Sequence, residues 1–191
     1  MLKNLSIGDT FPDVRLPDEE GALHRLSELQ GSDVLVVCLG RGEHCPRERT
    51  HQRELLRFDE WAAVAFTKLV TILPNTLHDV SKLKLSTGAR WTFLADEKLE
   101  LQRALDIREY TDLHHDATVP HTVILSPGLR IEKVYVGYWY WGRPSSHQLW
   151  QDLGEILPRF TPDFDPTTPE ARATWLAKQQ PKRRGREPVH A

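Results

Sequence analysis

Residues 34–48 read VLVVCLGRGEHCPRE, an apolar run that breaks at two glycines and gives way to a polar segment opening on Cys45 and Pro46. A continuous Val-rich run is typical of a strand that is buried on both faces of a sheet. Proline fits the first turn of a helix, where its missing N–H would have no intrahelical partner. These residues therefore predict a central strand over Val34–Leu39, a short loop, and a long helix that follows Cys45.

The segments on either side of this stretch predict further strands and helices. Residues 10–27 contain two short extended stretches around a turn, which predicts an N-terminal hairpin with Val14, Leu16 and Leu23 facing inward. The remaining elements are expected as a strand at 67–73, a helix at 77–88, a strand at 91–94, a short helix at 98–106, an antiparallel strand pair at 122–125 and 131–136, and a closing helix between 145 and 158.

The length of the chain and its C-terminal composition set the domain organisation. A chain of 191 residues is long enough for one α/β core with extensions. Residues beyond 160 are rich in proline and charge and end in a basic run. We therefore expect one domain over residues 1–160 and a polar, basic tail over residues 161–191, with one short helix around 172–178.

Four aromatic residues in succession, Tyr138, Trp139, Tyr140 and Trp141, follow the last predicted strand. Side chains on a strand alternate between its faces, so one pair is expected to pack on the core and the other to face outward. Exposed aromatic side chains are enriched at interfaces, and a homodimer contact or a substrate wall is one interpretation of the outer pair.

Composition and charge exclude several classes of protein. The formal net charge is −2, which argues against nucleic-acid binding through a phosphate-neutralising face. No apolar run has the length of a signal peptide or approaches the roughly 20 residues of a membrane-spanning helix, so we expect no membrane association and a cytoplasmic protein. In that compartment the two cysteines are expected to be thiols rather than a disulfide.

Several motifs, taken with the order of the predicted elements, resemble a known family. They are Arg41-Gly42-Glu43-His44-Cys45-Pro46-Arg47-Glu48, Thr118-Val119-Pro120-His121-Thr122, Gly8-Asp9-Thr10-Phe11-Pro12 and Leu26-Ser27-Glu28-Leu29. The chain resembles the peroxiredoxin-like proteins of the alkyl hydroperoxide reductase/thiol-specific antioxidant (redoxin) family, within the thioredoxin-like superfamily. The resemblance implies an α/β thioredoxin-like fold, with a central mixed sheet flanked by helices and an N-terminal hairpin extension.

Three positions differ from the pattern of these relatives. Glu48 stands where thioredoxins carry the second cysteine of Cys-x-x-Cys, so no local disulfide can form. Gly42 stands where typical peroxiredoxins place a threonine or serine that orients the peroxide. Cys38 replaces a proline further upstream in that motif.

The candidate catalytic residues are Cys45, Arg41, Glu48 and Pro120. Cys45 lies at a predicted helix N-terminus, where the partial positive charge of the backbone favours thiolate over thiol. Arg41, together with Arg47 and His44, can add positive charge, while Glu48 can oppose that charge or accept a proton. The resemblance implies that Pro120 forms a cis peptide bond beside Cys45 and positions the backbone before it for contact with a substrate.

Cys38 has a different setting from Cys45. It lies inside the predicted central strand, where a free cysteine behaves as a small hydrophobic residue. We expect a structural role for Cys38, the alternative being a resolving thiol.

The leading functional hypothesis is a thiol oxidoreductase with one reactive cysteine, a peroxiredoxin-like antioxidant enzyme. Cys45 would reduce a peroxide or a disulfide, and a thioredoxin-type protein or a low-molecular-weight thiol would restore it. A second hypothesis is a redox-inert binding module that docks partners through the Pro120 loop and the strand of Trp139 and Trp141.

A third hypothesis is a metal-handling protein. It would use histidines together with Cys45 and Glu48, and the candidates are His44, His51, His114, His115 and His121. Their spacing matches no standard zinc pattern, so neither a metal nor another cofactor is predicted.

Overall fold

A computed structural model describes residues 5–138, 141–161, 168–170 and 173. Trp139 and Tyr140 lie outside the described residues. So do most of the predicted tail and of its predicted short helix. The division into a domain and a tail therefore stays a prediction.

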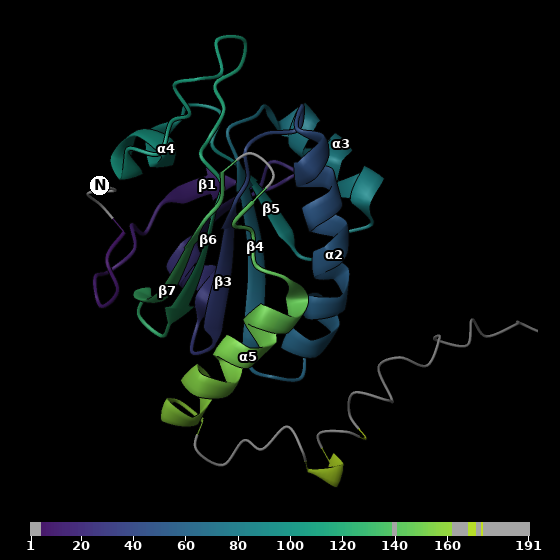
Figure 1. Cartoon of the computed structure of the whole chain (residues 1–191), viewed down its shortest axis with the longest axis vertical. Coiled ribbons are helices and arrows are strands. Elements are labelled where there is room, and N and C mark those ends of the chain that lie inside the picture. The colour runs from purple at the N-terminus through teal and green to yellow at the C-terminus, as the bar shows by residue number, and fades with distance from the viewer. Residues whose placement is uncertain (1–4, 139–140, 162–167, 171–172, 174–191) are drawn as a thin grey trace, which may run out of the picture.

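A five-stranded sheet forms the centre of the molecule, with strands in the order β5-β4-β3-β6-β7 (Figure 1). The strands are β3 (Val34–Leu39), β4 (Thr67–Leu73), β5 (Thr92–Ala95), β6 (His121–Ser126) and β7 (Arg130–Val136). β3 pairs in parallel with β4 and antiparallel with β6, so the sheet is mixed. The predicted central strand and the antiparallel β6–β7 pair are confirmed.

Helices cover both faces of the sheet. Val34, Val36 and Cys38 of β3 face one hydrophobic cluster, whereas Leu35 and Val37 face the other. The first cluster includes residues of α2 (Pro46–Ala62), α3 (Leu77–Thr87) and α5 (Ser146–Ile156), and the second includes residues of α1 (Leu26–Gln30) and α4 (Glu100–Leu105). The two-sided burial of β3 explains why its sequence is a continuous apolar run rather than an alternating one.

The N-terminal hairpin consists of β1 (Arg15–Pro17) and β2 (Leu23–Arg25), as predicted. Leu16 is buried, but Leu23 is 52% exposed, so the prediction that Leu23 faces inward is wrong. The register gives the reason: Leu16 lies opposite His24, and directly paired residues share a face of an antiparallel pair. Leu23 is therefore on the outer face.

The chain turns sharply after β7. The backbone N–H of Tyr138 donates to the carbonyl of Trp141 at 2.9 Å, and the reverse bond measures 2.8 Å. Tyr138 and Trp141 are both strongly exposed, so the predicted in-and-out alternation of a strand is wrong for these two residues. α5 then begins at the cap Ser145, whose side chain accepts from the backbone of Gln148, and it continues into a short 3₁₀ turn, η1 (Leu157–Arg159).

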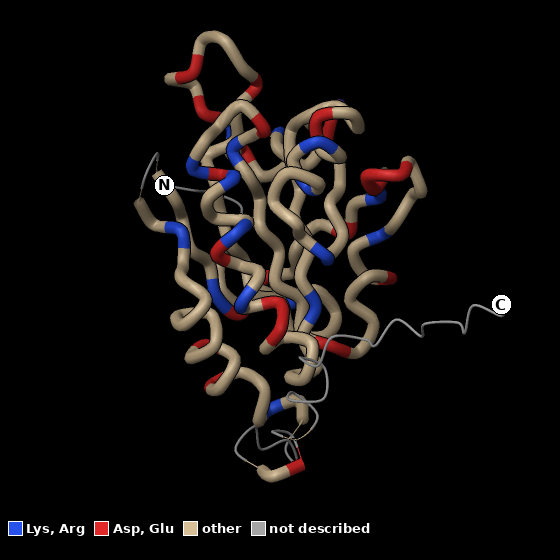
Figure 2. The backbone as a smooth tube through the Cα atoms, turned by 90° about the vertical axis from the view of Figure 1, so that its right-hand side faces the viewer, with Lys and Arg blue, Asp and Glu red and all other residues tan. Residues whose placement is uncertain are grey.

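Two global properties follow from the described residues. Acidic and basic residues are interspersed over the side of the molecule in Figure 2, in agreement with the net charge of −2. Among the described residues, no helix combines the length and the apolar character that crossing a bilayer requires.

Candidate active site

The loop after β3 is fixed by backbone hydrogen bonds that place Cys45 at the N-cap of α2. Gly40 N–H donates to the carbonyl of Ile72 at 2.9 Å, which continues the β3–β4 ladder. Cys45 N–H donates to the carbonyl of Gly42 at 3.1 Å, and the Cys45 carbonyl accepts from Glu48 N–H at 3.0 Å. The predicted start of the helix is confirmed. The residue Cys45 is only 6% exposed, so little more than a small molecule can approach it directly.

Arg41 brings a positive charge to Cys45. Its Nε donates to Glu109 Oε2 at 2.6 Å, and its Nη2 donates to Asp112 Oδ2 at 2.8 Å. Burial disfavours the charged guanidinium, but the hydrogen bonds and charges of Glu109 and of the Cys45 side chain outweigh burial and raise the pKa of Arg41. Arg41 is therefore a fixed cation on the loop that leads to Cys45.

The acidic partners of Arg41 come from the loop between α4 and β6, which projects from the top of the molecule in Figure 1. Glu109 N–H donates to the carbonyl of Ala117 at 2.8 Å, and Thr118 N–H donates to the carbonyl of Arg41 at 3.2 Å. These bonds tie the loop to itself and to the segment before Cys45. Sequence analysis missed both Glu109 and Asp112, because no periodic pattern marks the residues of this loop.

Glu48 forms a buried ion pair with Arg143. Glu48 is 1% exposed, and its Oε2 accepts from Arg143 Nη2 at 3.3 Å and from the backbone N–H of Arg41 at 3.0 Å. Burial alone would raise the pKa of Glu48, but the charge of Arg143 and the hydrogen bonds lower it below its ordinary value of 4.5. Glu48 is therefore ionised, and it fixes the loop that carries Arg41.

A chain of side-chain hydrogen bonds continues from Glu48 into the core. Gln52 Nε2 donates to Glu48 Oε1 at 2.7 Å, Thr71 Oγ1 donates to Gln52 Oε1 at 2.9 Å, and Trp91 Nε1 donates to Thr71 Oγ1 at 2.9 Å. These buried polar groups satisfy one another, so they fix the orientation of the Glu48 carboxylate.

Cys38 faces the hydrophobic cluster that contains residues of α2, and it is buried. Burial and the charge of Glu48 raise the pKa of Cys38 to about 12. The thiolate is the nucleophile in thiol–disulfide chemistry, so Cys38 is poorly suited to act as a resolving thiol. This agrees with the structural role expected from the sequence.

The peptide bond before Pro120 is trans, so the prediction of a cis bond is wrong. Val119 N–H donates to the carbonyl of Ile107 at 2.8 Å, and the Pro120 carbonyl accepts from Gly137 N–H at 2.7 Å. The trans form is the lower-energy isomer of an X–Pro bond by about 0.5–1 kcal/mol, and here the neighbouring polar groups are already paired around it.

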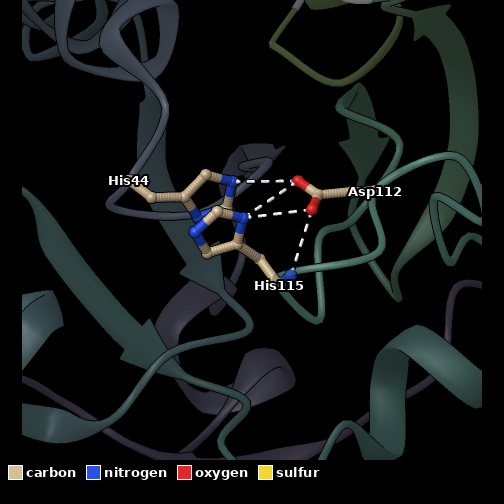
Figure 3. A group of neighbouring side chains, drawn as sticks. All are labelled: His44, Asp112 and His115. Atoms are coloured by element: carbon tan, nitrogen blue, oxygen red, sulfur yellow. Dashed lines mark hydrogen bonds and ion pairs between the residues drawn. The ribbon is translucent and has the colours of Figure 1, made fainter.

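The histidines divide into two groups. His51 and His121 are buried, and burial lowers the pKa of each below its ordinary value of 6.5, which favours the neutral form. His44 and His115 stack with their ring centroids 3.7 Å apart, and both face Asp112 (Figure 3). The side chains that could hold a metal ion among the described residues are thus His44, Asp112 and His115 rather than the larger set considered from the sequence.

Gly42 has no room for the hydroxyl side chain of typical peroxiredoxins. Its φ is +140°, a conformation essentially reserved for glycine, and a Cβ there would lie 2.7 Å from His44 Cε1. The His44 ring folds over the space that a threonine or serine would need. The backbone conformation of the loop and the position of the His44 ring therefore both favour glycine at position 42.

Gly42→Thr is expected to lower the free energy of unfolding by about 1–3 kcal/mol, because a β-branched residue is strained at this φ. Urea unfolding of the variant measures this effect. The matched control is Gly154→Ala in α5, where a Cβ meets nothing within 4 Å and which should be neutral or stabilising. A Gly42→Thr variant as stable as wild type would contradict this account of the loop.

Comparisons with known proteins agree with the geometry. The chain belongs to the AhpC/TSA family, which matches residues 7–134. AhpC from Enterococcus faecalis superposes with a TM-score of 0.71 at 12% identity, covering 85% of this chain and 98% of that one. No curated protein sequence matches the chain.

Two further solved structures share the fold. The peroxidoxin BcpB from Mycobacterium tuberculosis has a TM-score of 0.63 and 18% identity, covering 80% of this chain and 97% of its own. A cysteine-to-serine mutant of peroxiredoxin Q from Xanthomonas campestris has a TM-score of 0.60 and 17% identity, covering 80% of this chain and 95% of its own. The thioredoxin-like fold with an N-terminal hairpin is thus confirmed.

Proposed function

We propose that this protein is a thiol-dependent peroxidase in which Cys45 reduces a peroxide and an external thiol restores it. The observation that carries the proposal is the position of Cys45 at the N-cap of α2, on a loop whose Arg41 guanidinium is held in place by Glu109 and Asp112. A cation and a helix N-terminus both stabilise a thiolate, the reactive form of cysteine. Membership of the AhpC/TSA family supports the same chemistry.

The reaction needs no second cysteine in the chain. The Cys45 thiolate attacks one peroxide oxygen, the O–O bond breaks, and a proton converts the leaving oxygen into an alcohol or water. The resulting sulfenic acid reacts with an external thiol to give a mixed disulfide and water. A second thiol then releases Cys45 as a thiol and leaves the oxidised reductant as a disulfide.

The site favours a small oxidant and an external reductant. Cys45 is nearly buried, so a peroxide reaches it more readily than a protein disulfide does. Glu48 occupies the position at which thioredoxins carry their second cysteine, and Cys38 is held as a thiol. The reductant is therefore a low-molecular-weight thiol or a thioredoxin-type protein. In this proposal Arg41 supplies positive charge and Glu48 fixes the loop that carries Arg41, while a role of Pro120 in positioning the substrate stays a prediction.

The proposal is tested with hydrogen peroxide and either dithiothreitol, glutathione or thioredoxin as reductant. Wild type and Cys38→Ala are expected to consume peroxide, whereas Cys45→Ser is expected to lose all turnover. Mass spectrometry after mild peroxide treatment should show the oxygen on Cys45. Peroxide consumption that survives Cys45→Ser, or a Cys45 that resists oxidation and alkylation, would overturn the proposal and favour the redox-inert binding module.

A further inference from the structure

The structure assigns a site for a divalent transition-metal ion of the zinc class to His44, Asp112 and His115. The site does not depend on the redox role proposed for Cys45. His44 comes from the loop before α2, and Asp112 and His115 come from the loop between α4 and β6 (Figure 3). One ligand atom from each residue lies within 4.8 Å of the other two. Two imidazoles and one carboxylate are a donor set that zinc and similar ions take in proteins.

Two of the distances between the donor atoms are close to those of a tetrahedral site. Metal–ligand bonds of about 2.0–2.1 Å place two ligands of a tetrahedron about 3.3–3.4 Å apart. His44 Nε2 lies 3.5 Å from Asp112 Oδ2, and His115 Nδ1 lies 3.2 Å from the same oxygen. Because the two imidazole rings are stacked and nearly parallel, one ring must rotate about its side-chain torsions to direct its lone pair at a common ion.

The charges of these groups favour a cation between them. The Arg41 guanidinium has only donors, so His44 Nε2, at 3.2 Å, and Asp112 Oδ2, at 2.8 Å, both present lone pairs to a cation. The backbone N–H groups of His114 and His115 donate to Asp112 Oδ1 at 3.0 Å each, which fixes the orientation of the carboxylate. Because the two rings are stacked in parallel, protonation of both would place like charges face to face.

Arg41 at present supplies positive charge to this cluster. Its Nη2 contacts Asp112 Oδ2 at 2.8 Å, and its Nη1 lies 3.2 Å from His44 Nε2. Its Nε bond to Glu109, at 2.6 Å, does not involve these donors. A metal ion would replace the Nη groups of Arg41 as the partner of Asp112 and His44. Arg41 would keep its hydrogen bond to Glu109.

The cluster is open to solvent on one side. Asp112 and His115 line an open hollow of about 390 Å³ in the same loop, and the His115 side chain is 47% exposed. Three protein ligands and an open fourth position are typical of a zinc site that keeps a water or exchangeable ligand. The hollow provides the entry path that such a site needs.

Zinc titration of the full-length protein by calorimetry tests the assignment. Wild type is expected to bind one Zn²⁺ per chain, and His44→Ala, Asp112→Asn and His115→Ala are each expected to weaken binding by at least about tenfold. His115→Ala alters the most exposed ligand and leaves the core intact, so it decides the question if another variant is unstable. His78→Ala, an exposed histidine on α3, is the matched control and should bind as wild type does.

Two further variants separate this site from the alternatives. Cys45→Ser should bind zinc as wild type does, so failure of the peroxidase proposal leaves this test unaffected. Arg41→Gln should bind zinc more tightly, because the competing cation is removed from Asp112. The assignment would be overturned if His44→Ala, Asp112→Asn and His115→Ala all bound zinc as tightly as wild type. It would also be overturned if Cys45→Ser or His78→Ala lost zinc binding. Weaker binding by Arg41→Gln would contradict the exchange of guanidinium for metal.

Discussion

Replacing Glu48 with glutamine is expected to lower the free energy of unfolding by about 3–5 kcal/mol, the usual cost of removing one member of a buried ion pair. Glu48 is 1% exposed and the Arg143 side chain 10%, so the guanidinium would stay buried after losing the carboxylate of Glu48. Glutamine keeps the size of the side chain and an acceptor for the backbone of Arg41. The decrease in the free energy of unfolding therefore results from the lost charge rather than from a cavity. Urea unfolding of the two proteins measures it.

Two companions make this result specific. The double variant Glu48→Gln/Arg143→Met should be more stable than Glu48→Gln, because the buried cation is removed as well. Glu43→Gln serves as the control on the same loop, since Glu43 pairs with the more exposed Arg49 and Lys82, and it should cost about 0–1 kcal/mol. Equal costs for Glu48→Gln and Glu43→Gln would show that the buried pair contributes little.

The pH dependence of stability gives an independent measure of the same carboxylate. The pKa of Glu48 is lower in the folded protein than its ordinary value of 4.5, so below that pH the unfolded chain binds more protons. The contribution of Glu48 is complete above the ordinary value and is lost as the pH falls through the lowered one. The stability difference between wild type and Glu48→Gln should therefore shrink as the pH falls below 4.5.

Arg41→Gln is expected to slow peroxide reduction by about 10²–10³-fold, the range found when a fixed electrostatic donor is removed from an active site. Arg41 is the cation on the loop that leads to Cys45, where Glu109 and Asp112 hold it, and glutamine removes its charge. The rate of Cys45 alkylation near neutral pH should fall with the peroxidase rate, a change that a purely structural role of Arg41 would not produce.

Arg49→Gln is the matched control for this variant. Arg49 lies in the first turn of α2, but its guanidinium pairs with Glu43 at 3.1 Å. We expect less than a tenfold change in peroxide turnover for it. An Arg41→Gln enzyme with the same turnover and alkylation rates as wild type would remove Arg41 from the site.

The main part of the fold could be predicted from local patterns because these record burial. The apolar run of β3 reflects contact with a hydrophobic cluster on each face, and Pro46 after Cys45 marks the start of α2. The wrong predictions concern which side chains are buried, at places where the strand register or a turn decides burial. Leu23 is apolar but lies on the outer face through its register, and the chain turns back between Tyr138 and Trp141.

The candidate site could be predicted only where its residues are neighbours in the chain. Cys45, Arg41 and Glu48 lie within one turn-and-helix segment, and their grouping follows from that segment alone. Glu109 and Arg143 are far from Cys45 in sequence, and a charged residue in a loop gives no sign that it will be buried. From the sequence, Arg143 fits an anion contact or a surface ion pair, whereas the structure buries it against Glu48.

The His44 ring over Gly42 restricts how the loop can change by single substitutions. A side chain at position 42 needs both a different backbone conformation and a different place for the imidazole. Positions 42 and 44 are in contact, so the effects of substitutions at the two positions on stability should be strongly non-additive.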